Sequence, residues 1–361
     1  MKNFYKGKKV LVTGHTGFKG SWLTLWLSNM GADVYGISDS VPTSPSNFEL
    51  LNLNNKIHNF NFDILNYDSV YQTISDITPD IVFHMAAQAL VRTSYDDPLK
   101  TIMVNSIGTS NILEALRKIN KEITAVIITS DKVYDNVEWI WGYKETDVIG
   151  GKDPYSASKG MAELAIKTYQ ESFFSKDDSN IKLAITRAGN VIGGGDWAKD
   201  RIVPDCIRSW SQNNAVDIRN PSATRPWQHV LEPLSGYLHL ANSLSNDSNL
   251  NGEAFNFGPS ATANHTVEEL IIEMEKHWEN VVWNNLSDTT NQMSEAGLLK
   301  LNCDKAQTYL NWMPALNFEE NIKMTIEWYK AYYENEDMYS YSIKQIEKYQ
   351  KKAKKLNAYF K

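Results

Sequence analysis

Hydrophobic positions in the first half of the chain follow two alternating patterns. Short runs rich in Val, Ile and Phe are separated by longer segments in which apolar residues recur every three or four positions. The runs predict strands at 8–14, 33–38, 57–63, 80–86, 125–130 and 181–187, and the longer segments predict helices at 18–32, 67–77, 96–119 and 153–174. Because strands that alternate with helices are joined by crossover connections, this order predicts an α/β fold with a doubly wound parallel sheet.

The pattern changes after about residue 190. Turn-rich stretches such as GGGDW, RNPSATRPW and FNFGPSATANHT separate shorter helices there, which is typical of an irregular, mixed second lobe. A chain of 361 residues also exceeds one ordinary domain. We therefore expect a sheet domain over 1–190 with some elements added from later in the chain, a smaller substrate-binding lobe over 191–330, and a helical tail over 331–361.

Composition narrows the class of protein. Hydrophobic residues make up 42% of the chain, and mean hydropathy is -0.42. No apolar run approaches the roughly 20 residues of a membrane span, and the start of the chain lacks the apolar core of a signal peptide. We expect a cytoplasmic protein with no membrane partner. A net charge of -7 argues against nucleic acid as its main partner, and no metal-ligand spacing occurs, so we expect no metal.

The first expected turn carries glycines spaced G-x-x-G-x-x-G, at Gly14, Gly17 and Gly20. Glycine allows a sharp bend and a close approach to a pyrophosphate, while the following helix offers free N–H groups and a partial positive charge. This context predicts a Rossmann-like dinucleotide site. The second strand ends at Ser38 and Asp39, with no Arg nearby to take a 2′-phosphate, which favours NAD over NADP.

Tyr155 and Lys159 form a second chemical signal. They lie four positions apart on the expected helix 153–174, so both side chains project from one face. A phenol with an ordinary pKa near 10 is no base at neutral pH, but an adjacent ammonium and a nicotinamide cation stabilise the phenolate. The pair therefore predicts that Tyr155 moves a proton beside a bound nicotinamide.

These motifs, with GHTGFKGSWL, SDKVYDN, GNVIGGGDWAKDR and RPWQHVLEPLSGY, resemble the CDP-glucose 4,6-dehydratase family of extended short-chain dehydrogenases/reductases. The resemblance covers nearly the whole chain. It implies an NAD-dependent lyase that converts CDP-glucose to CDP-4-dehydro-6-deoxyglucose and water, in deoxysugar biosynthesis for surface polysaccharide. After the fifth strand the chain has Ser130, Asp131 and Lys132, where related dehydratases carry Ser/Thr-Asp-Glu.

The same resemblance assigns catalytic roles. Tyr155 would take the proton of the 4-hydroxyl, with Lys159 holding the phenolate and the cofactor ribose and Ser130 hydrogen-bonding O4. Asp131 would be the acid that lets the C6 hydroxyl leave as water, which requires burial to raise its pKa. Lys132 would either remove the C5 proton, with a lowered pKa, or stabilise the enolate while one carboxylate or Tyr155 moves the protons.

Cofactor contacts are implied as well. Asp63 would meet the adenine amino group, and Asn105 matches the superfamily's structural asparagine. The small residues after the fourth strand suit a backbone that passes close to a cofactor. The expected cofactor-binding residues are Gly14, Thr16, Gly17, Phe18, Lys19, Gly20, Asp63, Ile64, Ala86, Ala87, Gln88, Asn105, Tyr155 and Lys159.

A CDP-sugar needs donors for its pyrophosphate, and guanidinium groups bind phosphate in a fork. The expected substrate-binding residues are Arg92, Asn190, Arg201, Arg219, Arg225 and His229. Arg225 is the first choice, because it resembles the family's Arg before a W-x-x-V segment. A lone histidine such as His229 is more often a core residue than a ligand.

Two alternatives remain open. An epimerase, or a dehydratase for another nucleotide sugar, would use the same fold, although an epimerase needs no acid for water loss. A non-catalytic dinucleotide sensor would also use this fold, but would not need Tyr155 and Lys159. Family resemblance further implies a homodimer in which the helices near 96–119 and 153–174 pack against their symmetry mates; their apolar faces fit a monomer core equally well.

Overall fold

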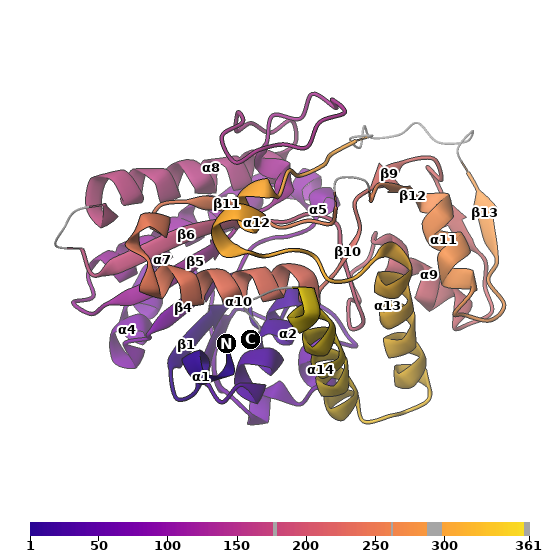
Figure 1. The fold of residues 1–361 in the computed structure, drawn as a ribbon, viewed down its shortest axis with the longest axis horizontal. Helices are drawn as coiled ribbons and strands as arrows, with labels where there is room; N and C mark the ends of the chain where they lie inside the picture. Colours follow the sequence, from indigo (N-terminus) through magenta and orange to yellow (C-terminus); the bar gives the residue numbers. More distant parts are fainter. Residues whose placement is uncertain (176–178, 261–262, 287–297, 357–361) are drawn as a thin grey trace.

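The computed structural model describes residues 1–175, 179–260, 263–286 and 298–356 (Figure 1). Its main sheet has seven strands in the order β11-β6-β5-β4-β1-β2-β3, and all neighbouring pairs run parallel. The strands are β1 Lys9–Thr13, β2 Asp33–Ser38, β3 His58–Asn61, β4 Ile81–His84, β5 Ile123–Ile128, β6 Ile181–Arg187 and β11 Ala254–Asn256. The predicted doubly wound sheet is confirmed. Strand order reverses between β1 and β4, and in sheets of this kind the crevice for a ligand lies at the carboxyl ends of these strands.

Helices cover both faces of this sheet (Figure 1). α4 (Tyr67–Ile77), α7 (Thr109–Arg117) and α8 (Pro154–Tyr169) lie on one face, and α2 (Phe18–Asn29) and α10 (Leu231–Asn246) lie on the other. Successive strand side chains point to opposite faces, so Leu11 and Val82 join one core while Val12 and Phe83 join the other.

The second lobe consists of short strand pairs and helices, to the right in Figure 1. The pairs are β7 Val191–Ile192 with β10 Gln228–His229, β8 Val216–Ile218 with β13 Trp283–Asn285, and β9 Thr224–Arg225 with β12 His265–Thr266. Its helices are α9 Ile202–Trp210, α11 Val267–Glu275 and α13 Phe318–Tyr333, whereas α12 Asp304–Leu310 packs against β11 and α10. β11 and α10 also come from beyond residue 190 but pack with the main sheet. The predicted domain boundaries remain predictions.

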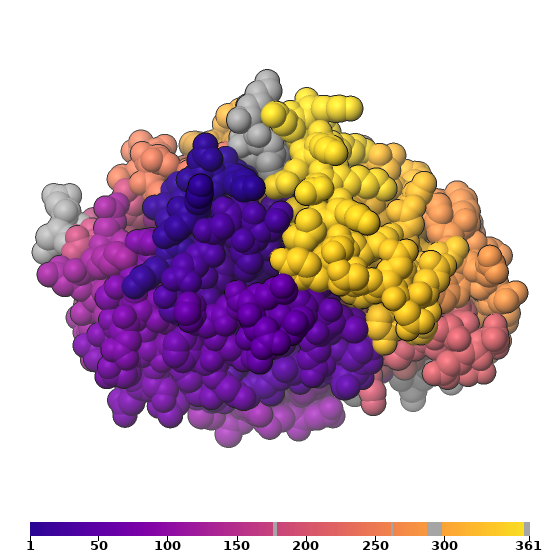
Figure 2. All heavy atoms as spheres, turned by 90° about the horizontal axis from the view of Figure 1, so that it is seen from below, coloured from indigo at the N-terminus to yellow at the C-terminus, as the bar shows by residue number. Residues whose placement is uncertain are grey.

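The C-terminal helix α14 (Met338–Leu356) packs on α2, and Figure 2 shows the C-terminal residues against the N-terminal ones. α2 is apolar around most of its circumference because the sheet covers one side and α14 another. The rings of Trp26 and Tyr349 meet edge to face with centroids 5.9 Å apart. The tail therefore completes the core of the sheet domain.

The expected helix 96–119 comprises α6 Pro98–Ile102, the π-helix η2 Met103–Gly108 and α7, and the expected helix 153–174 comprises α8 and the π-helix η4 Gln170–Phe174. The remaining elements are α1 Lys2–Tyr5, α3 Asn47–Leu50, α5 Val91–Asp96 and the 3₁₀ turns η1 Leu53–Asn55, η3 Asp131–Val133 and η5 Ser248–Leu250. No helix within the described ranges is long and apolar enough to cross a membrane. Among the same residues, no three His, Cys, Asp or Glu side chains gather as a metal site would require.

Candidate active site

The glycine turn forms one wall of the crevice. Gly14 has a φ of +71°, and a Cβ there would lie 2.8 Å from the Ala86 backbone, so only glycine lets β1 and β4 end this close together. A Cβ at Gly20 would lie 2.1 Å from the Gly14 carbonyl oxygen. Gly17 caps α2, and its Cβ direction is open except for that carbonyl at 3.4 Å. An open N-terminus on a 12-residue helix fits the pyrophosphate of NAD.

Side chains near the turn hold it to neighbouring strands. The Thr16 hydroxyl donates to the Ser40 carbonyl (2.6 Å) and shares a hydrogen bond with the Ser38 hydroxyl (2.7 Å), at the end of β2. Asp63 accepts the Leu65 N–H (2.9 Å) in the turn before α4, and Asn66 is the residue that caps that helix. Phe18 and Ala87 are half-buried along the same crevice wall. Their contacts with a cofactor remain predictions.

Asn105 joins the loop after β4 to the helix that carries Tyr155. Its Oδ1 accepts the Gln88 N–H (2.8 Å), and its Nδ2 donates to the Gln88 carbonyl (3.1 Å) and to Ser158 Oγ (2.8 Å). Asn105 lies in the π-helix η2. Behind it Gly108 leaves room for Ile64, because a Cβ there would lie 2.5 Å from Ile64 Cδ1. Asn105 therefore acts structurally in this fold.

The segment after β5 places a carboxyl group in the same crevice. Ser130 caps the 3₁₀ turn η3, where its Oγ accepts the Lys132 N–H (3.2 Å) and donates to Asp131 Oδ1 (3.0 Å). Asp131 is only 3% exposed. Gly189 makes room for it, because a Cβ at that position would lie 1.9 Å from Asp131 Oδ2. Lys132 is half-buried beside them, and its part in removing the C5 proton remains a prediction.

Tyr155 and Lys159 project from α8 into this region. The helix begins there because Asp153 accepts the Ser156 N–H (3.0 Å) and Pro154 occupies the first turn. Burial raises the pKa of Tyr155 to about 12, while a hydrogen bond with Ser130 acts in the opposite direction. Burial and the nearby Lys19 lower the pKa of Lys159 to about 7. Both side chains are thus buried, and nearby charges shift their pKa values as well.

Two further cations, Lys19 and Arg201, lie close to Asp131 and Tyr155 respectively. Burial and the charge of Arg201 lower the pKa of Lys19 to about 8, whereas Asp131 raises it. Arg201 pairs with the buried Asp196 (2.8 Å), which raises the pKa of the guanidinium. Lys19 therefore lies near Asp131 and Lys159 as well as beside the glycine turn. Its expected phosphate contact and the substrate contact of Arg201 remain predictions.

The other predicted substrate residues are more dispersed. Arg92 forms an ion pair with Asp200 (2.5 Å), beside Arg201 in the chain. Arg225 lies in β9 of the second lobe, half-buried, and donates to the Thr224 carbonyl (2.8 Å). Arg219 is exposed after β8. Arg92 thus lies in α5 and the other two arginines lie in the second lobe, and their pyrophosphate contacts remain predictions.

Asn190 and His229 lie on the paired strands β7 and β10 or next to them. Asn190 has a φ of +39°, and its carbonyl accepts the Gln228 N–H (3.1 Å). His229 is fully buried against Trp22, and its Nδ1 accepts the Leu231 N–H (3.3 Å). Burial lowers the pKa of His229 to about 3. These are the surroundings of a neutral core histidine rather than of a substrate ligand.

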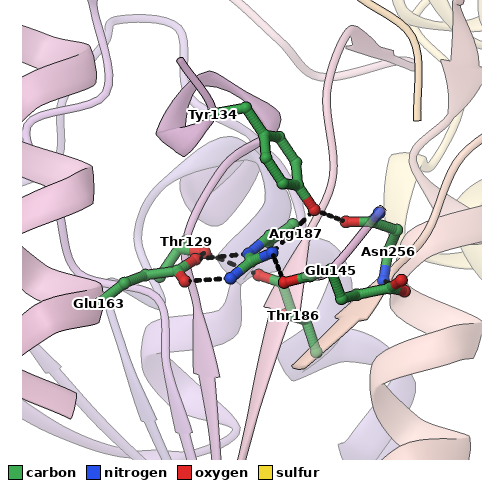
Figure 3. Close-up of polar contacts among 7 residues, drawn as sticks. All are labelled: Thr129, Tyr134, Glu145, Glu163, Thr186, Arg187 and Asn256. Atoms are coloured by element: carbon green, nitrogen blue, oxygen red, sulfur yellow. Dashed lines mark hydrogen bonds and ion pairs between the residues drawn. The ribbon is translucent and has the colours of Figure 1, made fainter. Parts of the chain in front are cut away.

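A buried polar network fastens α8 to the sheet (Figure 3). Arg187, at the end of β6, donates to both carboxylate oxygens of Glu163 (2.8 and 2.5 Å), one turn beyond Lys159. The Thr129 hydroxyl also donates to Glu163 (2.6 Å), and Arg187 donates to the Tyr134 hydroxyl (2.7 Å). The network thus joins α8, which carries Tyr155 and Lys159, to the ends of β5 and β6.

Sequence patterns missed Gly189 and the Glu163–Arg187 pair. Gly189 could have been found from its position, because it is the second residue after the buried strand β6, which pairs with β5. Glycine at such a position often marks a close approach of two backbones. Glu163 follows Lys159 by four positions, so it lies on the same helix face. Its partner was not readable, because pairing it with Arg187 requires the strand order.

Comparison with known proteins identifies the family. The family model described as GDP-mannose 4,6 dehydratase matches residues 11–325. A CDP-glucose 4,6-dehydratase from Salmonella typhimurium is 47% identical over 352 residues, which cover 96% of this chain and 98% of that protein.

Solved structures share the fold. An epimerase from Methanothermobacter thermautotrophicus matches with a TM-score of 0.77 at 25% identity, over 92% of this chain and 95% of that one. The UDP-glucuronic acid 4-epimerase of Bacillus cereus, solved with UDP-glucuronic acid and NAD, matches with a TM-score of 0.76 at 25% identity, over 90% and 100% of the two chains. The chain therefore belongs to the GDP-mannose 4,6-dehydratase family, whose members share this Rossmann-like fold.

Proposed function

We propose that this protein is an NAD-dependent CDP-glucose 4,6-dehydratase. The observation that carries the proposal is a buried carboxyl group, Asp131, next to Tyr155 and Ser130 in the cofactor crevice. An epimerase needs no acid there, whereas a dehydratase must protonate a departing hydroxyl. The 47% identity to a CDP-glucose 4,6-dehydratase supports the choice of nucleotide.

Binding of NAD would use the open turn of Gly14, Gly17 and Gly20 and the N-terminus of α2. When bound, NAD⁺ contributes a positively charged nicotinamide that takes a hydride from the sugar and gives it back. Ser38 and Asp39 at the end of β2 leave no positive charge for a 2′-phosphate, which supports NAD over NADP.

Proton transfers would be divided between Tyr155 and Asp131. Tyr155 accepts the proton of the 4-hydroxyl; because burial raises the pKa of its phenol to about 12, the cations Lys159 and Arg201 must favour the phenolate as that proton moves. Ser130 would hydrogen-bond O4 from the cap of η3. The resulting ketone acidifies C5–H, and Asp131 would protonate the oxygen that leaves C6. Lys132 would take the C5 proton or stabilise the enolate.

We further propose a homodimer built on α6, η2 and α8. These neighbouring elements expose apolar side chains, namely Leu99, Met103, Ile107, Met161 and Leu164. A row of exposed apolar side chains on adjacent helices favours burial against a second copy of the same surface. The enzyme would work in the cytoplasm, where nucleotide sugars and NAD are made.

The experiment that tests the activity is incubation of the purified protein with NAD⁺ and CDP-glucose, UDP-glucose or dTDP-glucose, followed by mass spectrometry. Loss of one water from CDP-glucose alone is expected, and the Tyr155→Phe protein serves as the inactive control. Water loss from another sugar nucleotide would correct the substrate, and no mass change with any of the three would favour epimerisation or cofactor sensing.

A further inference from the structure

Few backbone hydrogen bonds hold the turn η3, which follows Ser130. The hydrogen bonds that the N–H groups of Asp131, Val133 and Tyr134 donate are each 3.4 Å long, whereas such bonds usually measure about 2.7–3.2 Å. The Val133 carbonyl makes a shorter contact, because it accepts the Gly150 N–H at 2.8 Å. Side-chain contacts must therefore contribute to fixing this turn.

Side chains at both ends of the turn bind one buried ion pair (Figure 3). Before the turn, the Thr129 hydroxyl donates to Glu163 Oε1 (2.6 Å), and after it the Tyr134 hydroxyl accepts from Arg187 Nη1 (2.7 Å). Arg187 donates to both Glu163 oxygens (2.8 and 2.5 Å), and none of these four side chains is more than 5% exposed. The four side chains form a clamp on the turn, and the clamp also holds α8, where Glu163 follows Lys159 by four positions.

The Tyr134 hydroxyl has a fixed direction in this clamp. A guanidinium has no acceptor, so the hydroxyl accepts from Arg187 and donates its own proton to Asn256 Oδ1 (2.8 Å). Asn256 presents that oxygen because its Nδ2 donates to the carbonyls of Tyr143 (2.9 Å) and Asn302 (3.0 Å). The Tyr134 ring also stacks on the Tyr143 ring, with centroids 5.1 Å apart. Loss of the hydroxyl would release the end of the turn from the ion pair.

We propose that Thr129 and Tyr134 are positioning residues that serve different steps of the dehydration; the proposal rests on the function proposed above. Thr129 immediately precedes Ser130, which would hydrogen-bond O4 during the oxidation at C4. Tyr134 follows Asp131 and Lys132, the groups assigned to the loss of water, by three and two positions. Neither positioning residue touches NAD or the sugar in this account, and each acts through the neighbours that it holds in place.

The two steps can be measured separately because the cofactor is reduced between them. Oxidation at C4 sends a hydride to NAD⁺ and the O4 proton to Tyr155. The C5 proton and the C6 hydroxyl then leave as water, the electron pair from C5 forms the C5–C6 double bond, and the hydride returns to C6 with a proton to C5. NADH therefore accumulates when only the second step is slow.

The kinetic test mixes the NAD⁺-loaded protein rapidly with CDP-glucose and follows NADH absorbance and dehydrated product. Tyr134→Phe keeps the ring, so the oxidation should stay within about twofold of wild type while product forms about tenfold more slowly and NADH accumulates. Thr129→Val removes the other contact, so the oxidation itself should slow about tenfold, without accumulation of NADH. Equal slowing of both steps in Tyr134→Phe, or the same behaviour of the two variants, would overturn the proposal.

Tyr349→Phe on α14 is the matched control. The Tyr349 hydroxyl is also buried and also bonds two side chains, Glu232 (2.7 Å) and Ser235 (2.9 Å). Both steps should keep their wild-type rates in this variant. NADH accumulation equal to that in Tyr134→Phe would show that loss of any buried tyrosine hydroxyl has this effect, and would contradict the assignment.

Amide hydrogen exchange tests the clamp without any turnover. In the presence of NAD⁺, Tyr134→Phe should raise the exchange rates of amides 131–135 by about tenfold. Amides 159–166 of α8 should keep their wild-type rates, because Glu163 still pairs with Arg187. Unchanged exchange at 131–135 would overturn the clamp. This measurement still decides whether the clamp exists if the wild-type protein dehydrates no sugar nucleotide, a result that would overturn the proposed function by itself.

Discussion

At the scale of single residues, the position of the Asp131 carboxyl group depends on the absence of a side chain at Gly189. Gly189 has no Cβ, and one would lie 1.9 Å from Asp131 Oδ2. Asp131 is held from the other side by the Ser130 hydroxyl (3.0 Å). The carboxyl group is therefore confined between a hydroxyl and a bare backbone, and its direction is set by packing rather than by an ion pair.

Gly189→Ala tests this confinement. The added methyl group must displace the carboxyl group of Asp131, so we expect kcat for dehydration to fall by about 10²-fold or more. Binding of NAD⁺, measured by calorimetry, should stay near the wild-type value, because Gly189 is outside the glycine turn. A variant that keeps wild-type kcat, with its thermal midpoint unchanged, would show that the carboxyl position is not critical.

Much of the residue-scale picture was readable from the sequence. The glycine turn before α2, Tyr155 and Lys159 on α8, and the turn after β5 form where the patterns predict them, while the roles of these residues stay predictions. The sequence does not show which residues that are far apart along the chain come close together in the fold. Lys19 approaches Asp131 only because β1 and β5 lie in one sheet.

At the scale of elements, α8 is fixed to the sheet by one buried ion pair. Arg187 and Glu163 are 3% and 1% exposed, and their two hydrogen bonds run in parallel. Burial of both charges is tolerated because Thr129 and Tyr134 satisfy the remaining atoms. The pair sets where α8 lies against β5 and β6, and hence where Tyr155 faces Ser130.

Glu163→Gln should lower the free energy of unfolding by about 3–5 kcal/mol, because Arg187 is left buried without its counter-charge. Urea titration measures this loss. The double variant Glu163→Leu with Arg187→Met should lose clearly less than the sum of the single variants. As a control, Lys167→Met breaks the exposed pair with Glu171 and should change stability by no more than about 0.5 kcal/mol. Strictly additive losses in the double variant would argue against a coupled pair.

A second buried carboxyl group ties α10 to the tail. Glu232 accepts the N–H groups of Ala315 (2.8 Å) and Leu316 (2.7 Å) and the Tyr349 hydroxyl (2.7 Å). Burial raises its pKa to about 7 from an ordinary 4.5. The protonated group therefore favours the folded state below pH 4.5, and this contribution is lost as pH rises through 7.

Glu232→Gln should reveal that dependence. The wild-type free energy of unfolding, relative to that of the variant, should fall as pH rises from about 4.5 to about 7 and then stay level, because a neutral amide cannot titrate. Urea titrations at a series of pH values measure the difference. A difference that stays constant across this range, or that grows with pH, would contradict the raised pKa.

At the scale of the whole molecule, the exposed apolar side chains of α6, η2 and α8 are unusual for a monomer. Leu99 is 67% exposed, Ile107 51% and Leu164 57%, on adjacent elements. Sequence patterns left their partner undecided between a core and a second copy. In the fold these three side chains are exposed, so they do not pack in the core of the monomer.

Ile107→Glu should convert the proposed dimer to a monomer, because it places a charge in the apolar surface that the second copy would bury. Light scattering coupled to gel filtration measures the mass. Ile272→Glu is the matched control. Ile272 is exposed to a similar extent (49%) but lies on α11 of the second lobe, so this variant should stay dimeric. A wild-type mass equal to one chain would sink the dimer proposal.

Sequence patterns predicted the sheet and most of its helices, because each strand and helix carries its own periodicity. They placed the later elements poorly: β11 is three residues long and α10 is buried nearly throughout. Neither has a pattern that shows which domain it joins. Their place is set by contacts with β5 and β6, which only the assembled chain provides.

The measurement that tests the central claim most directly follows a label within the sugar. CDP-glucose carrying deuterium at C4 is incubated with the protein and catalytic NAD⁺, and the product is examined by mass spectrometry and NMR. The account predicts a dehydrated product that carries the deuterium at C6, with NAD⁺ not consumed. An undehydrated sugar that keeps the deuterium at C4 but has the inverted configuration there would instead indicate an epimerase and contradict the account.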